Sequence, residues 1–193
     1  MSAQPQTQSS PTKVVTGKAR ASYVYVFQPR TSQLSGKDEY SITLLIPKTD
    51  RETMGRLKSA MNAAKEARWH GKEPPGMQLP IHDGDRDKPN GGSYGDECCG
   101  HWVLNVKTKD RPGVVDANNN KVFDPNEFVS GDYCRASLNA FAYDNARKGL
   151  SFGLNNIQVI AKGEPLSSRS RPEDDFAEYV GDGKPAANDD FTW

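Results

Sequence analysis

The chain has 193 residues, of which 35% are hydrophobic, and its 25 Lys and Arg balance its 25 Asp and Glu. This length predicts one domain with tails rather than two domains. No run approaches the roughly 18 apolar residues of a membrane span, and residues 1–12 lack the apolar segment of a signal peptide, so we expect a cytoplasmic protein without membrane partners.

The neutral net charge hides an asymmetry along the chain. Residues 173–193 hold seven acidic residues and one lysine, a charge of −6, which leaves 24 basic and 18 acidic residues, or +6, in the rest. A basic body with an acidic tail is typical of proteins that bind phosphate and regulate that binding, although a solvated disordered end is the alternative. We expect a disordered arm (1–12), one domain (13–165) and a flexible acidic tail (166–193).

The first elements predict a β-hairpin followed by a helix. Residues 14–28 and 40–46 are rich in Val, Ile, Leu and Tyr and alternate as strands do, with a turn at 33–37. In the first strand we expect two faces, listed here as Tyr23, Tyr25 and Phe27 against Arg20, Ser22, Val24 and Val26. Thr49 and Glu52 form a capping box that would start a helix ending near Gly71.

The second half of the chain is also predominantly β in pattern. Residues 72–100 are rich in Gly and Pro and predict a long irregular loop of the kind that often carries function. Strands are expected at 101–109, 114–115, 121–123, 133–143 and 150–161. Five or six strands joined mostly by short turns, with one helix, favour a mainly β fold, an OB-like small closed β-barrel.

Residues 133–143 are the most informative strand for function. The even positions are small and apolar, which suits a core, whereas the odd positions are aromatic, polar and basic. Aromatic planes and cations are what single-stranded DNA needs for stacking and phosphate contact. The candidate binding residues on this face are Tyr133, Arg135, Asn139, Phe141 and Tyr143. The alternative is that Phe141 and Tyr143 cover a second hydrophobic patch.

Other strands and the long loop supply further candidates. Basic residues stand on the polar side of neighbouring strands or directly after them, namely Lys18, Arg20, Lys107, Lys109 and Arg111. Phosphate contact explains this placement, although lysines on an exposed sheet also act only as solubilisers. Trp69 and Tyr94 are additional stacking candidates that could equally belong to the core.

We assign no cofactor, no metal and no catalytic residue, and expect a binding protein rather than an enzyme. Residues 116–127 place oxygen side chains at several positions of a calcium loop, but Lys121 stands where the motif needs Gly. Cys98, Cys99 and His101 lack the second ligand pair of a zinc site, and the acids near Asp83 have no partner cluster. No nucleotide loop or nucleophile motif occurs.

The tail contains a repeated pair of acids followed by an aromatic residue. The residues concerned are Asp174, Asp175 and Phe176, then Asp189, Asp190 and Phe191, with Trp193 at the end. Acids around one aromatic side chain can dock in a basic, apolar pocket of a partner, and the same charges can compete with DNA for a basic groove.

The order of these parts resembles phage single-stranded DNA-binding proteins. The resemblance rests on the Tyr-rich segment 22–27, the segment 40–48 ending in Leu-Ile-Pro-Lys, the helix, residues 135–144 and 149–158, and the acid–aromatic end. It is closest to a phage family once catalogued as a domain of unknown function and later recognised as an OB-fold single-stranded DNA binder. The layout is also similar to a podovirus replication protein whose tail ends in Asp-Phe.

The resemblance implies sequence-independent binding of single-stranded DNA in phage DNA replication or recombination, in the host cytoplasm. It further implies that the tail recruits replication proteins such as a polymerase or a helicase. This chain continues past Phe191 with Thr192 and Trp193, so a pocket built for a terminal Phe would meet a different end here. The alternatives are a double-stranded nucleic-acid binder, a non-catalytic interaction or calcium-binding module, and a metal-dependent nuclease, and self-association is left open.

Overall fold

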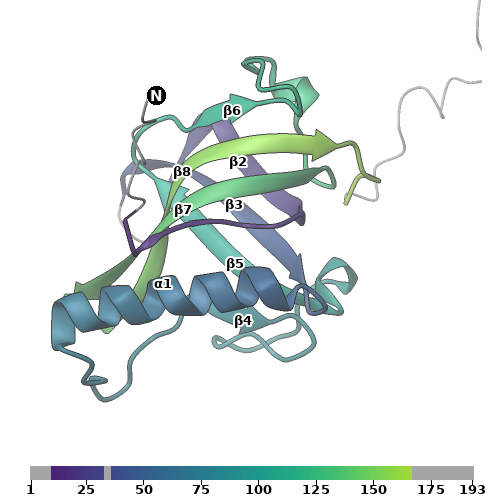
Figure 1. The fold of residues 1–193 in the computed structure, drawn as a ribbon. Coiled ribbons are helices and arrows are strands. Elements are labelled where there is room, and N and C mark those ends of the chain that lie inside the picture. Colours follow the sequence, from purple (N-terminus) through teal and green to yellow (C-terminus); the bar gives the residue numbers. More distant parts are fainter. Residues whose placement is uncertain (1–9, 33–35, 167–193) are drawn as a thin grey trace, which may run out of the picture.

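The computed structural model describes residues 10–32 and 36–166 (Figure 1). Within them lie one α-helix, α1 (Arg51–Trp69), and eight strands. The strands are β1 (Lys13–Val15), β2 (Ala19–Thr31), β3 (Asp38–Pro47), β4 (Ile81–Asp83), β5 (His101–Thr108), β6 (Gly113–Val115), β7 (Tyr133–Asp144) and β8 (Lys148–Ala161). Two short 3-10 helices, η1 (Asp96–Cys98) and η2 (Pro125–Glu127), complete the order.

Five of the strands pair into a closed ring. β2, β3 and β5 are antiparallel neighbours, β7 and β8 form an antiparallel hairpin, β7 pairs with β2, and β8 runs parallel to β5. The short strands β1, β4 and β6 extend this sheet beside β7, β5 and β8. The prediction of a mainly β, OB-like fold with one helix is therefore confirmed for the described residues.

The core fills the ring from alternating strand positions and from one face of the helix. On β7, Cys134, Ala136 and Leu138 are fully buried while Arg135 and Asn139 are exposed, as the alternation predicted. The helix α1 buries Leu57, Ala60 and Ala64 and packs against β7, β1 and β8, lying below the strands in Figure 1. Burial of these apolar surfaces is the main stabilising contribution to the fold.

The prediction of one regular strand over residues 14–28 is wrong. The strand is broken at Gly17, and the buried hydroxyl of Thr16 accepts a hydrogen bond from the backbone N–H of Ala136. A register shift then follows Ser22 in β2. A β-bulge of this kind moves the next residues to the other face. Ala21 before the shift and Val26 after it are therefore both buried, although they have opposite parity.

The helix also starts one residue later than the predicted capping box. Asp50 is the N-cap, and its carboxylate accepts a hydrogen bond of 3.0 Å from the backbone N–H of Thr53 and one of 2.6 Å from the Thr53 hydroxyl. Glu52 instead pairs with Arg56 one turn along the helix. A carboxylate is a strong acceptor at a helix N-terminus, which explains why Asp50 takes the cap in place of Thr49.

The remaining segments agree with the sequence in outline. Asp116 accepts backbone N–H bonds of 2.8 Å from Asn118 and Asn120, which makes residues 116–120 a tight polar turn. Cys98, Cys99 and Cys134 are free cysteines. Over the described ranges, no helix has the length and apolar character that crossing a membrane requires. The predicted arm lies mostly, and the tail almost entirely, outside the described residues.

Candidate nucleic-acid interface

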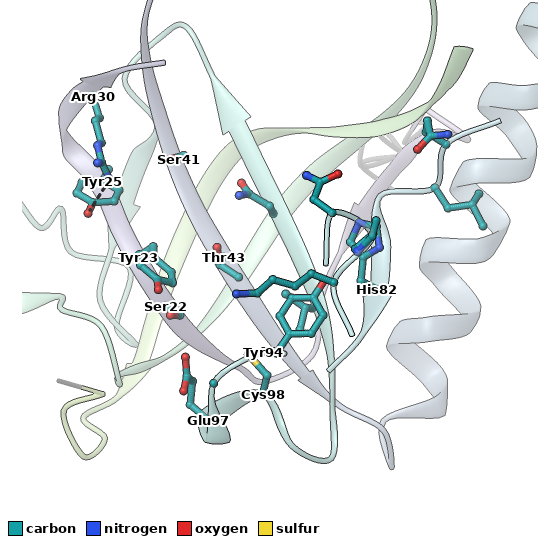
Figure 2. Close-up of a pocket in the computed structure, with 18 of the residues that line it drawn as sticks. Ser22, Tyr23, Tyr25, Arg30, Ser41, Thr43, His82, Tyr94, Glu97 and Cys98 are labelled. Atoms are coloured by element: carbon teal, nitrogen blue, oxygen red, sulfur yellow. Dashed lines mark hydrogen bonds between the residues drawn. The ribbon is translucent and has the colours of Figure 1, made fainter. Parts of the chain in front are cut away.

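A groove of about 710 Å³ crosses β2, β3 and β5 and is walled on one side by the long excursion between α1 and β5 (Figure 2). Its residues from β2, β3 and β5 are Ser22, Tyr23, Tyr25, Arg30, Ser41, Thr43, Val103 and Asn105. Its other residues are Gln78, Leu79, His82, Lys88, Pro89, Asn90, Tyr94, Gly95, Glu97, Cys98, Tyr143 and Arg147. The groove thus combines four tyrosines with three basic side chains against one acidic one.

The β2 wall presents two tyrosines in different settings. Tyr23 lies in the bulge with a φ of +49°, and 62% of its surface is exposed. A left-handed backbone is unfavourable for a residue with a Cβ, so the bulge holds Tyr23 outward at a conformational cost. Tyr25 is covered by Arg30, whose guanidinium lies 5.2 Å from the ring centroid and donates a hydrogen bond of 3.2 Å to the hydroxyl.

The floor of the groove is made of small polar side chains. Ser41 and Thr43 on β3 lie between the β2 wall and β5, where Asn105 pairs with Thr43 in register. Short side chains leave room above the sheet for a flat ligand group. The floor therefore gives access to the tyrosines without blocking the groove.

The opposite wall comes from residues 88–98. The Lys88 ammonium lies 5.4 Å from the centroid of the Tyr94 ring, so a cation again accompanies a tyrosine. Tyr94 packs against a small buried cluster of Leu45, Cys98 and Val103 beneath the loop. Burial raises the pKa of both the Tyr94 hydroxyl and the Cys98 thiol, so this wall keeps neutral hydrogen-bonding groups at neutral pH.

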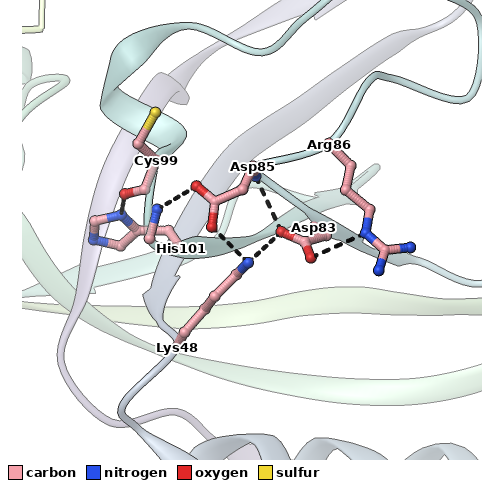
Figure 3. Close-up of polar contacts among 7 residues, drawn as sticks. Lys48, Asp83, Asp85, Arg86, Cys99 and His101 are labelled. Atoms are coloured by element: carbon pink, nitrogen blue, oxygen red, sulfur yellow. Dashed lines mark hydrogen bonds and ion pairs between the residues drawn. The ribbon is translucent and has the colours of Figure 1, made fainter.

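Lys48, directly after β3, forms ion pairs at the base of this wall (Figure 3). Its ammonium donates to a carboxylate oxygen of Asp83 and, at 2.6 Å, to Asp85. These bonds hold the pKa of both carboxyl groups below the ordinary value of 3.8 and raise that of Lys48. The acids that the sequence left open for a divalent ion thus surround an ammonium group instead.

Two of the predicted binding residues, Tyr94 and Tyr143, line the groove. Lys107 lies in an adjoining depression of about 370 Å³ that shares Arg30 with the groove, and its ammonium pairs with Glu39 at 2.9 Å. Their role in binding stays a prediction, but the structure brings these three residues to one face of the ring.

Four other predicted residues sit in separate depressions. Lys18, Arg20 and Tyr133 line one of about 390 Å³, where the Lys18 ammonium lies 4.3 Å from the Tyr133 ring centroid. Arg20 donates to the carbonyl oxygens of Gly131 and Glu164, so part of its role is structural. Arg111 borders another depression that contains the exposed ring of Phe123.

The remaining predicted residues do not line the groove. Arg135, Asn139 and Phe141 are exposed on the outer face of β7, and Lys109 is exposed just past β5. Trp69 packs against the core, and its ring N–H lies 3.5 Å from a carboxylate oxygen of Asp144.

Five aromatic or basic residues of the groove were not among the sequence candidates, namely Tyr23, Tyr25, Arg30, Lys88 and Arg147. The two tyrosines were recognised as sharing a strand face, but nothing in that alternation says which face meets solvent. Arg30 and Lys88 lie in segments without periodicity. The aromatic content of residues 22–27 was the signal available in the sequence.

No three His, Cys, Asp or Glu side chains between residues 10 and 166, leaving aside 33–35, lie close enough together to hold a metal ion. Cys99 is exposed, and its carbonyl oxygen lies 2.7 Å from Nδ1 of His101.

Comparison with known proteins gives consistent matches over most of the chain. The single-stranded DNA-binding protein of bacteriophage Enc34, solved in complex with single-stranded DNA, is 27% identical and superposes with a TM-score of 0.66, covering 81% of this chain and 90% of that one. A C-terminally truncated form of that protein gives a TM-score of 0.68 at 26% identity, covering 80% and 88% of the two chains.

Two further matches have lower sequence identity. The single-stranded DNA-binding protein gp2.5 of bacteriophage T7 shares the fold, with a TM-score of 0.55 at 17% identity, over 91% of this chain and 98% of that one. Protein p50 of Acyrthosiphon pisum secondary endosymbiont phage 1 is 24% identical over 165 residues, which are 80% of this chain and 86% of the relative. The family model described as Enterobacter phage Enc34, ssDNA-binding protein matches residues 12–192, and the chain belongs to that family.

Proposed function

We propose that the chain binds single-stranded DNA in the groove across β2, β3 and β5, without catalysing a reaction. The observation that carries the proposal is the set of four tyrosines along one groove, of which Tyr23 is exposed and Tyr25 and Tyr94 are each paired with a cation. The support from comparison is the similar Enc34 protein solved with single-stranded DNA. Stacking on an aromatic ring contributes roughly 1–3 kcal/mol per base and requires an unpaired base.

The composition of the groove favours binding that is independent of sequence. Tyrosine rings accept any base, because every base has a flat aromatic face. Arg30, Lys88 and Arg147 can contact the phosphates, which are the same in every sequence. A duplex hides its base faces, so the same groove disfavours double-stranded DNA.

The acidic tail is proposed to compete with DNA for this groove and to dock replication proteins such as a polymerase or a helicase. Leu166, where the described chain ends, packs against the cluster of Leu45, Cys98 and Val103, beside Tyr94. The described part of the chain therefore ends beside the groove wall. Residues 173–193 carry a charge of −6, which complements a basic groove. The expected setting is phage DNA replication or recombination in the host cytoplasm.

A fluorescence titration with oligo-dT over a range of salt tests the binding proposal. Three phosphate contacts predict that the logarithm of affinity falls with the logarithm of salt with a slope of about −2. Oligonucleotides of mixed sequence should bind within a few-fold of oligo-dT, and a duplex of the same length should bind more weakly. An affinity that ignores salt, or a strong preference for the duplex, would contradict the proposal.

A further inference from the structure

The groove wall that carries Lys88 and Tyr94 belongs to a segment with little structure of its own. The regular structure of residues 84–100 is limited to the short 3-10 helix η1 and an isolated β-bridge between Asp87 and Ser93. Three of the glycines in this segment, Gly91, Gly92 and Gly100, have positive φ values of 71° to 88°. Glycine-rich backbone loses much conformational freedom when it is ordered. The position of this wall must therefore be fixed by contacts at its ends and beneath it.

The contacts at its ends converge on Lys48. Asp85, at the start of the segment, binds the Lys48 ammonium with one carboxylate oxygen and the N–H of Gly100, at the end, with the other at 2.7 Å. The backbone N–H of Lys48 also donates to the carbonyl of Gly100 at 3.0 Å. Lys48, which directly follows β3, is thus bonded to both ends of the segment, and these bonds close a neck at its base.

The neck is tightly packed as well as bonded. The N–H of Gly84 donates to the carbonyl of His101 at 2.9 Å, and a Cβ at Gly84 would collide with the carbonyl oxygens of Cys98 and His101. Asp83 accepts a further hydrogen bond of 3.0 Å from the N–H of Asp85. Movement of the neck would therefore break several bonds at once and shift the wall above it.

Lys48 itself does not line the groove. Its side chain is 30% exposed, and its ammonium lies 5.1 Å from the centroid of the Trp102 ring, with two carboxylates as partners. The Arg86 side chain lies 3.5 Å from the other carboxylate oxygen of Asp83, so two cations balance two carboxylates and the cluster has no net positive charge to attract phosphate. Direct attraction of DNA is thus not the contribution of this cluster.

We propose that Lys48, with Asp83 and Asp85, is a positioning cluster that holds the wall carrying Lys88 and Tyr94 at the spacing that a bound DNA strand requires. This inference rests on the proposed function of the groove. It assigns these residues an indirect role, since they act on DNA only through the segment 84–100.

The decisive variant is Asp83→Asn combined with Asp85→Asn. It removes two negative charges near the groove, so electrostatics alone predicts tighter binding of DNA. The positioning role predicts the opposite, a rise in the Kd for oligo-dT of about 5-fold or more, the lower end of the loss of one stacked base. Binding that becomes tighter or stays equal in the folded variant overturns the proposal.

Lys48→Met provides a second measurement with a matched control, Lys58→Met, which removes one positive charge from the exposed face of α1. Lys48→Met should weaken binding with an unchanged salt slope, whereas loss of a phosphate contact would lower the slope by about 0.7. Lys48→Arg should restore most of the affinity, because a guanidinium can bridge two carboxylates. In a Tyr94→Ala, Lys88→Met background, the effect of Lys48→Met should disappear.

Hydrogen exchange of the DNA-free protein separates this proposal from the proposed function. Amides of residues 86–98 should exchange faster in Lys48→Met than in the wild type, while those of β7 should not change. If the wild type does not bind oligo-dT, the proposed function fails whatever this exchange shows. If it binds, and the exchange of 86–98 is unaltered by Lys48→Met, the positioning role is wrong.

Discussion

Replacement of Tyr23 by alanine or glycine should weaken DNA binding, and the glycine variant should be at least as stable as the alanine variant. Tyr23 is 62% exposed in the groove, so removal of its ring should cost about 1–3 kcal/mol of binding, or about 5- to 150-fold in Kd. Its φ of +49° costs a residue with a Cβ roughly 1–2 kcal/mol, which glycine avoids. Glycine elsewhere in a strand is less stable than alanine by about 0.5–1 kcal/mol.

The two effects predict that Tyr23→Gly unfolds with a free energy about 0–1.5 kcal/mol higher than that of Tyr23→Ala. Tyr25, whose φ is negative, is the matched control, and there the glycine variant should be the less stable one. Urea denaturation measures stability, and oligo-dT titration measures affinity. Glycine less stable than alanine at position 23 would refute the strained bulge, and wild-type affinity in both variants would refute the stacking role.

Three further predictions concern the groove, the tail and the acid range. Tyr143→Ala should cost about 1–3 kcal/mol of oligo-dT binding if Tyr143 stacks, and a folded variant with unchanged affinity would make it a packing residue. A chain that ends at Pro172 should bind oligo-dT more tightly than the full chain, and the difference should be largest at low salt. The reason is that the tail competes with DNA at a roughly millimolar effective concentration. Unchanged or weaker binding at low salt would leave the tail only a docking role. Because the pKa values of Asp83 and Asp85 are lowered by Lys48, their stabilisation is fully present above the unfolded value of 3.8 and is lost as pH falls through the folded values. The amide resonance of Gly100, which bonds to Asp85, should therefore stay constant down to about pH 4 and shift below it.

The sequence predicted the architecture well where one physical pattern dominates. The alternation of residues 133–143 gave the correct buried face of β7, because Cys134 and Leu138 have no competing polar role. The break at Gly17 and the bulge at Tyr23 were not predictable in this way. At the break, the buried Thr16 hydroxyl accepts a hydrogen bond from the N–H of Ala136, 120 residues away in the chain. At the bulge, the N–H of Val24 donates to the Ser130 hydroxyl, 106 residues away.

The candidate site was predicted only in part for a related reason. Tyr94 and Tyr143 could be selected as aromatic residues in a loop and on a strand, and both line the groove. The alternation along each strand separated its two faces but did not show which face lines the groove. Lys88 meets Tyr94 through the folding of a segment without periodicity, so only tertiary structure brings that pair together.

The ring of strands has consequences for the order in which the chain folds. Among the pairings of the ring in the described residues, only β2–β3 and β7–β8 join strands with no other element between them, whereas closure requires Ala19 to meet Cys134 and Lys107 to meet Gly153. Contacts that span so much sequence form slowly, because the chain entropy is lost before the contact is gained. We expect the two hairpins to form early and the closing pairs β2–β7 and β5–β8 to form last. Substitutions at the closing pairs should therefore mainly accelerate unfolding and leave the folding rate nearly unchanged.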